Sequence, residues 1–146
     1  MFFHLRLPPG SLSFFQYFLL TFENKKLMLI PDLYTVIKSE LIDDSLNSII
    51  TINPAHKIFE GHFPDNPILP GVVQLQIIKE LLETELNKPL TLKKGSNIKY
   101  TSTIVPKQDK KLEITIGLKF IDDRIKVNTV IKNSETVFLK FKGTFN

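Results

Sequence analysis

Several segments of the chain are rich in β-forming residues, and 112–120 alternates apolar and polar residues as a β-strand with one buried face does. Short runs rich in Asp, Asn, Ser or Lys separate these segments and mark turns. The pattern predicts six strands, at residues 35–42, 48–52, 97–105, 112–120, 124–131 and 136–143. The first two are expected to form a hairpin with its turn at 43–47, and the last four an antiparallel meander, giving a sheet of about six strands.

One segment after Gly71 has a helical period instead. Its apolar residues cover most of the circumference of a helix, so the helix is expected to be buried. These residues are Val72, Val73, Leu75, Ile77, Ile78, Leu81, Leu82 and Leu86. The sequence Asn87-Lys88-Pro89 should end the helix. Because the carboxylates come late, at Glu80, Glu83 and Glu85, the helix is expected to reach the surface toward its C-terminal end.

Residues 1–27 differ from the rest of the chain because phenylalanine is concentrated there and Pro8-Pro9-Gly10 interrupts the segment. The apolar run at 12–22 is too short to span a bilayer. We interpret 1–27 as an N-terminal extension to one domain at 28–146, with Met28 as a translation start. An amphipathic helix that packs on the domain or on a membrane, and a signal peptide, are the alternatives. The expected location is the cytoplasm.

Composition narrows the possible chemistry. Apolar residues make up 42% and charged residues 23% of the chain, as in ordinary globular proteins. The absence of cysteine excludes disulfides, thiolate metal sites and a cysteine nucleophile. The net charge of +4 and the lack of a basic and aromatic module argue against nucleic acid as a partner. Lysines cluster at 93, 94 and 99 and at 107, 110 and 111, as solvated turns or as a docking face for an acidic partner.

The loop that precedes the helix is the candidate site. Its prolines fix φ and its glycines allow conformations that other residues avoid, so it is a shaped loop that presents His62 at the mouth of a buried helix. A histidine in that place is suited to proton transfer. The free N–H groups of the first helical turn, after Pro70 and Gly71, would stabilise a carbonyl oxygen that gains negative charge. His56 has no metal-ligand partner at suitable spacing and is interpreted as a loop residue.

The loop resembles the signature of the FabZ-type 3-hydroxyacyl-acyl-carrier-protein dehydratases, G-H-F-P-G-x-P-x-x-P-G-V. In this chain the segment reads Gly61-His62-Phe63-Pro64-Asp65-Asn66-Pro67-Ile68-Leu69-Pro70-Gly71-Val72. The resemblance covers roughly residues 28–146. It implies an α+β hotdog fold, in which an antiparallel sheet of about six strands wraps around one long buried helix. Asp65 stands where the family usually has glycine, and we interpret it as a turn residue.

The resemblance implies dehydration of a (3R)-3-hydroxyacyl thioester to the trans-2-enoyl thioester. His62 would remove the α-proton, and a backbone N–H at Gly71 or Val72 would polarise the thioester carbonyl. Phe63 and Pro70 would contact substrate. A helix carboxylate from the other subunit of a dimer would assist loss of the hydroxyl, and neither a metal nor an organic cofactor would be needed. The implied partners are an acyl-carrier-protein or coenzyme A thioester and a second hotdog chain, as a homodimer or with a homologue.

The chain departs from the family at the helix carboxylate, whose position is occupied by Gln76. An amide forms hydrogen bonds but neither accepts nor releases a proton at neutral pH. Glu80 follows one helical turn later on the same face and could supply a displaced carboxylate. The better supported interpretation of Glu80 at this point is a solvated or ion-paired helix charge.

Three functions follow from these residues. The first is a dehydratase whose activity is reduced by Gln76. The second is a weakened subunit that binds acyl thioesters or acts with an active homologue. The third, a hotdog thioesterase, would hydrolyse the same polarised carbonyl.

Overall fold

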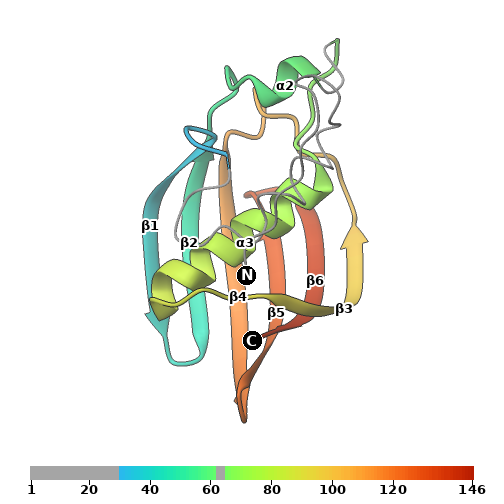
Figure 1. Ribbon diagram of the computed structural model, residues 1–146. Coiled ribbons are helices and arrows are strands. Elements are labelled where there is room, and N and C mark those ends of the chain that lie inside the picture. Colours follow the sequence, from blue (N-terminus) through green and yellow to red (C-terminus); the bar gives the residue numbers. More distant parts are fainter. Residues whose placement is uncertain (1–29, 62–64) are drawn as a thin grey trace, which may run out of the picture.

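The computed structural model describes residues 30–61 and 65–146, which form one curved sheet and two helices (Figure 1). The strands are β1 (Tyr34–Ile42), β2 (Ser45–Ile52), β3 (Leu92–Tyr100), β4 (Lys111–Ile121), β5 (Arg124–Lys132) and β6 (Val137–Phe145). The short helix α2 (Ile58–Gly61) and the long helix α3 (Gly71–Leu86) lie between β2 and β3. The helix α2 was not expected from the sequence and lies in the loop that carries the candidate site.

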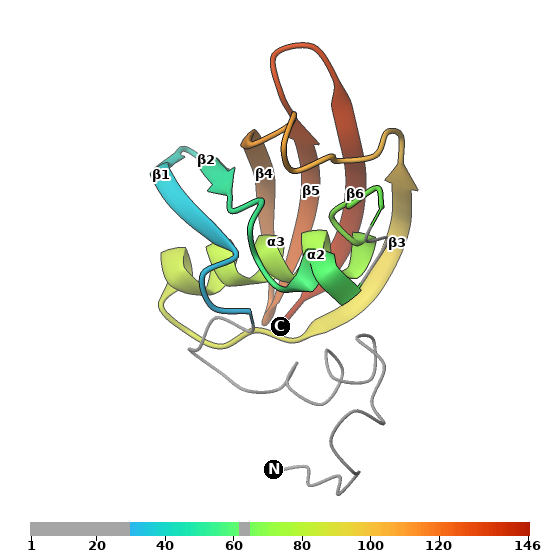
Figure 2. The same cartoon turned by 90° about the horizontal axis from the view of Figure 1, so that it is seen from above.

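The six strands form a single antiparallel sheet in the order β1-β2-β4-β5-β6-β3. Seen from above, the strands form an arc with α3 inside it (Figure 2). The expectation of an antiparallel sheet wrapped around one long helix is therefore confirmed. Period-two alternation positions the core, because the buried residues of β4 and β5 occupy every second position and face α3.

The expected meander of four strands is only partly present. The strands β4, β5 and β6 are consecutive neighbours, but β3 pairs with β6 at the edge of the sheet. The strand also begins and ends five residues earlier than expected, and residues 101–110 form a connection that crosses from the edge to β4. Alternation reports which residues form strands, but it does not report which strands pair.

The turn of the first hairpin is shorter than expected. It consists of Asp43 and Asp44, since β2 begins at Ser45. Asp43 has a φ of 55°, and Asp122 has the same φ in the β4–β5 turn. Two-residue hairpin loops need such left-handed residues, and a short carboxylate side chain tolerates this backbone well.

The helix α3 begins and ends where the sequence indicates. Pro70 is its N-cap residue, and Asn87 ends it in the left-handed region with a φ of 52°. The helix reaches the surface toward its C-terminal end as expected, but only after Lys79 and Glu80, which are buried together with their apolar neighbours. The helix reaches the surface one turn later, at Thr84 and Glu85.

Two glycines of the sheet offer a matched test of packing. A Cβ atom at Gly143 would lie 2.5 Å from Cζ of Phe141 and 2.8 Å from the backbone oxygen of Lys94, whereas a Cβ at Gly117 would lie 3.6 Å from the Asn128 oxygen. We expect Gly143→Ala to lower the unfolding free energy by about 1–3 kcal/mol and Gly117→Ala to change it by about 0.5 kcal/mol or less. Urea unfolding followed by circular dichroism measures both; equal losses would contradict a close contact specific to β6.

Candidate functional site

The first turn of α3 presents free backbone donors. The N–H groups of Val73 and Gln74 both donate to the carbonyl of Pro70, at 3.1 and 3.2 Å. Within the described residues, the N–H groups of Gly71 and Val72 donate to no protein acceptor. Two adjacent N–H groups at the positive end of a helix dipole are suited to bind a carbonyl oxygen.

Tyr100 of β3 covers the backbone of Gly71. A Cβ atom at position 71 would lie 2.5 Å from Cζ and 2.6 Å from the hydroxyl of Tyr100, so only glycine allows this approach. Desolvation by burial raises the pKa of the Tyr100 phenol, which therefore remains a neutral hydrogen-bond donor. The edge strand β3 thus contributes directly to the surroundings of the helix start.

A hollow of about 350 Å³ lies beside this contact. It is lined by Ile68, Leu69, Gly71, Gln74, Tyr100, Thr101, Ser102 and Thr103. The side chain of Gln74 is buried, its Nε2 donates to the Leu69 carbonyl at 3.3 Å, and its Oε1 has no partner among the described residues. The hollow therefore combines a free acceptor with the free donors of the helix start. Gln74 and Tyr100 were missed in the sequence because neither belongs to the loop motif.

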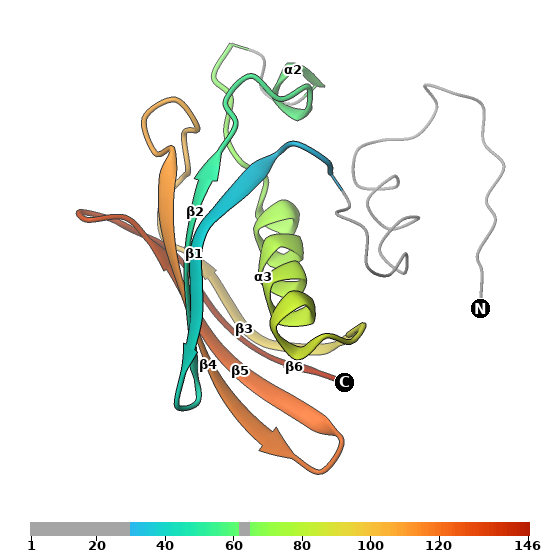
Figure 3. The same cartoon turned by 90° about the vertical axis from the view of Figure 1, so that its left-hand side faces the viewer.

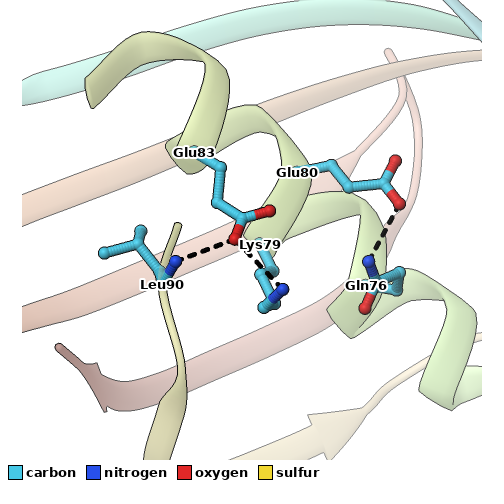
Figure 4. Close-up of polar contacts among 5 residues, drawn as sticks. All are labelled: Gln76, Lys79, Glu80, Glu83 and Leu90. Atoms are coloured by element: carbon cyan, nitrogen blue, oxygen red, sulfur yellow. Dashed lines mark hydrogen bonds and ion pairs between the residues drawn. The ribbon is translucent and has the colours of Figure 1, made fainter. Parts of the chain in front are cut away.

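Gln76 and Glu80 are brought together on α3, one turn apart (Figure 4). Nε2 of Gln76 donates to Oε2 of Glu80 at 2.9 Å, and the hydroxyl of Tyr34 in β1 donates to Oε1 of Glu80 at 2.6 Å. Gln76 is 4% and Glu80 8% exposed. Glu80 is therefore a buried hydrogen-bond acceptor, and the interpretation of a solvated charge is wrong.

The three side chains orient the amide of Gln76. Burial and the neighbouring Glu80 raise the pKa of Tyr34 far above its ordinary value, so Tyr34 stays a donor to the carboxylate. Because Nε2 of Gln76 is held by Glu80, its Oε1 is turned away and has no partner among the described residues (Figure 4). A buried acceptor without a partner costs about 1–3 kcal/mol, so a hydroxyl donor would bind there favourably.

A second polar group lies further along the same helix. Nζ of Lys79 is 3.1 Å from Oε2 of Glu83, and the same oxygen accepts from the N–H of Leu90 at 2.8 Å. Lys79 is 3% exposed. Glu83 thereby joins α3 to the segment that leads into β3, which fixes the helix against the edge of the sheet.

The other predicted site residues divide into two groups. His62 and Phe63 lie outside the described residues, so their positions are not part of the geometry above. Asp65 is exposed in a turn, and His56 lies in the loop after β2. Nδ1 of His56 accepts from the N–H of Ile58 at 3.0 Å, and its Nε2 is 2.8 Å from the carbonyl oxygen of Pro31. Both contacts of the ring are to backbone groups and stabilise the loop.

Comparison with known proteins identifies the family. The family model described as ApeI-like, ApeI dehydratase, matches residues 38–141. The chain belongs to the ApeI-like dehydratase family. A 3-hydroxyacyl-[acyl-carrier-protein] dehydratase FabZ from Lactobacillus helveticus is 30% identical over 132 residues, 80% of this chain and 86% of that protein. A FabZ from Lactococcus lactis subsp. cremoris is 29% identical over 114 residues, 72% and 76% of the two chains.

Solved structures confirm the hotdog fold of this ApeI-like chain. The dehydratase heterocomplex ApeI:P from Xenorhabdus doucetiae superposes with a TM-score of 0.62 at 18% identity, covering 76% of this chain and 96% of that one. A protein from Erwinia carotovora subsp. atroseptica gives a TM-score of 0.59 at 22% identity, covering 77% and 92%. The predicted resemblance to FabZ-type dehydratases is thus confirmed at the level of the family and fold.

Two further properties concern only the part of the chain that the structure describes. No helix there has the length and apolar character needed to cross a bilayer. In residues 30–61 and 65–146, no three His, Asp or Glu side chains group together as metal ligands would.

The hydrogen bond of Tyr34 predicts a pH dependence of stability. The phenol ionises near pH 10.0 in the unfolded chain and at higher pH in the folded chain. The stability that the neutral phenol contributes is therefore complete below pH 10. Above pH 10 the free energy of unfolding falls by about 1.4 kcal/mol per pH unit. We expect Tyr34→Phe to remove this part of the decrease in unfolding free energy, measured by urea unfolding between pH 8 and pH 11. Identical slopes for the two proteins would contradict the buried contact with Glu80.

Proposed function

We propose that this chain dehydrates (3R)-3-hydroxyacyl thioesters of an acyl-carrier protein or coenzyme A to trans-2-enoyl thioesters, in fatty-acid or polyketide-like lipid biosynthesis. The observation that carries the proposal is the orientation of Gln76, whose free, buried Oε1 can accept the hydrogen bond of a substrate hydroxyl. The free N–H groups of Gly71 and Val72 support it, since they can hold the thioester oxygen. The FabZ relatives are named as 3-hydroxyacyl-[acyl-carrier-protein] dehydratases.

Each group has one role in the proposed reaction. The imidazole of His62 takes a proton from C2 of the substrate while the N–H groups of Gly71 and Val72 stabilise the charge on the thioester oxygen. Oε1 of Gln76 accepts the 3-hydroxyl hydrogen bond and positions that group. The C2–C3 double bond then forms as the C3–O bond breaks, and the hydroxyl takes the proton from the His62 imidazolium and leaves as water. His62 is neutral again, so no net proton is gained or lost.

Glu80 acts in this proposal as a positioning residue and not as the acid. Both of its oxygens accept hydrogen bonds, from Tyr34 and from Gln76. The contact with Glu80 holds the Gln76 amide so that its Oε1 faces away from Glu80, where the proposed substrate hydroxyl would lie. The FabZ-type resemblance assigns the histidine and the helix residue of one site to two subunits, so the proposed working unit is a dimer.

A panel of substitutions tests these roles in an assay for enoyl product and for free acid. We expect His62→Ala to lower kcat by about 10²–10⁴-fold, as for loss of an acid–base group. Glu80→Gln should lower kcat by about tenfold, which corresponds to about 1.4 kcal/mol of lost positioning. Glu85→Gln is the matched control, because Glu85 is exposed on the same helix and should have no effect.

Gln76→Glu separates positioning from acid catalysis. It places a carboxylate at the family's position, and we expect kcat to rise. A fall of 10²-fold or more in Glu80→Gln, with a changed pH profile, would instead assign the acid to Glu80. Unchanged turnover in His62→Ala would contradict the dehydratase proposal, and release of free acid without enoyl product would favour a thioesterase.

A subunit that acts with an active homologue is the second candidate function, and Gln76 is the observation that favours it. The similar structure from Xenorhabdus doucetiae is named as the dehydratase heterocomplex ApeI:P. If this function holds, mixing the chain with a FabZ homologue that retains the helix glutamate should give a mixed dimer by native mass spectrometry, with more activity than either protein alone. Fully active homodimers and no mixed species would contradict it.

A further inference from the structure

The outer face of the sheet, on the side away from α3, carries rows of lysine. In β5 the residues that alternate with the buried core positions are exposed except the half-buried Val130; β4 and β6 pair with β5, and β3 pairs with β6. The lysines of this outer face are Lys94, Lys99, Lys111, Lys119, Lys126, Lys132, Lys140 and Lys142, all of them exposed. They come from four strands, so the outer face is formed by strand pairing rather than by runs of lysine along the chain.

Strand register brings these charges close together. One row across β3, β6, β5 and β4 reads Lys94, Thr144, Lys126 and Lys119. The next row reads Asn97, Lys142, Asn128 and Gly117, and it is followed by Lys99 opposite Lys140. Paired strands lie about 4.8 Å apart, and like charges directly opposite each other repel. The outer face therefore has a positive potential that an anionic partner would relieve.

The chain does not neutralise the outer face itself. Glu113 is the only carboxylate in β3, β4, β5 and β6; it lies opposite Lys132 in the register but not within ion-pair distance of it. Among the described residues the ion pairs are Lys38 with Glu40 and Lys79 with Glu83, so none of the outer-face lysines has a carboxylate partner. A net charge of this kind, confined to one face, is typical of a surface that binds an acidic partner.

A groove of about 400 Å³ opens in the middle of the outer face. Gly117 contributes no side chain to it, and Lys119, Lys126, Asn128 and Lys142 are among the residues that line it. These side chains supply hydrogen-bond donors to any carboxylate that enters. The groove can therefore hold protruding acidic side chains of a partner.

The shape of the outer face favours a protein over other polyanions. The sheet curves around α3, so its outer face is convex and meets a flat bilayer over only part of its area (Figures 2 and 3). Nucleic acid is disfavoured because Tyr100 and Phe120 pair with residues of the α3 side, leaving no aromatic ring on the outer face of β3–β6 for stacking.

Outward residues repeat about every 6.8 Å along a strand, close to the roughly 6 Å rise between residues four apart on a helix.

We propose that the outer face of β3–β6 docks an acidic helical surface of a partner protein. The carboxylates of that helix lie along the outward lysines of a strand, such as Lys140 and Lys142 of β6, and one or two of them enter the groove beside Gly117. Because the outer face and α3 lie on opposite sides of the sheet (Figure 3), the docked partner leaves the start of α3 open. The proposal is independent of the proposed dehydratase activity.

Binding of a synthetic helical peptide tests the docking surface. The probe is an alanine-based peptide of about 20 residues, long enough to be helical, with Glu at every fourth position; a second peptide has Gln at those positions. We expect the full chain to bind the Glu peptide with salt-dependent affinity and the Gln peptide at least about tenfold more weakly. The double variant Lys126→Glu/Lys142→Glu should weaken binding of the Glu peptide at least about tenfold, measured by fluorescence anisotropy.

A charge-matched control separates the outer face from net charge. Lys88→Glu/Lys110→Glu makes the same change at two exposed lysines outside the outer face and should retain most of the affinity. Circular dichroism checks that both variants fold. Equal loss in the two double variants, or equal binding of the Glu and Gln peptides, would overturn the proposal. Binding to phosphatidylglycerol vesicles, but not to the Glu peptide, would overturn it in favour of a membrane surface.

Discussion

The burial of α3 inside the curved sheet is the constraint on which the rest of the structure depends. A helix covered on most sides cannot leave its polar side chains in water, so those side chains must find partners inside the protein. Gln76 and Glu80 do so with Tyr34, and Lys79 does so with Glu83. The same burial removes solvent from Oε1 of Gln76 and leaves it without a partner among the described residues. The burial of α3 therefore accounts both for the packing of the helix and for the unpaired oxygen of Gln76.

Much of this architecture could be predicted from the sequence because it follows from local patterns. Segments rich in β-forming residues predicted five of the six strands with bounds close to those observed, and the apolar run after Gly71 predicted α3 with both of its ends. The loop motif predicted the family, since proline, glycine and histidine recur there at fixed spacing. The start of α3, with its free N–H groups, was also predictable from Pro70 and Gly71, because every helix start leaves such donors unpaired.

The features that could not be predicted depend on contacts between distant segments. Alternation does not report that β3 pairs with β6, and it cannot place Tyr100 against Gly71. Glu80 was interpreted as a solvated or ion-paired helix charge; its burial follows from packing around α3 and its contact with Tyr34, 46 residues away. In the sequence, the lysines of the outer face are scattered over four strands. They form one surface only because the strands pair in the observed register.

The crossing of residues 101–110 has a consequence for the order of folding. The hairpin β1–β2 and the meander β4–β6 close through short turns, so each can form from local contacts. Joining them requires pairs such as Leu46 with Ile116, and adding β3 requires pairs such as Ile98 with Phe141, which enclose long loops. The segment before α3 is fixed by the bond from the Leu69 N–H to the Ile104 oxygen within this crossing. The start of α3 therefore acquires its final shape only after β3 has paired with β6 and the crossing segment is in place.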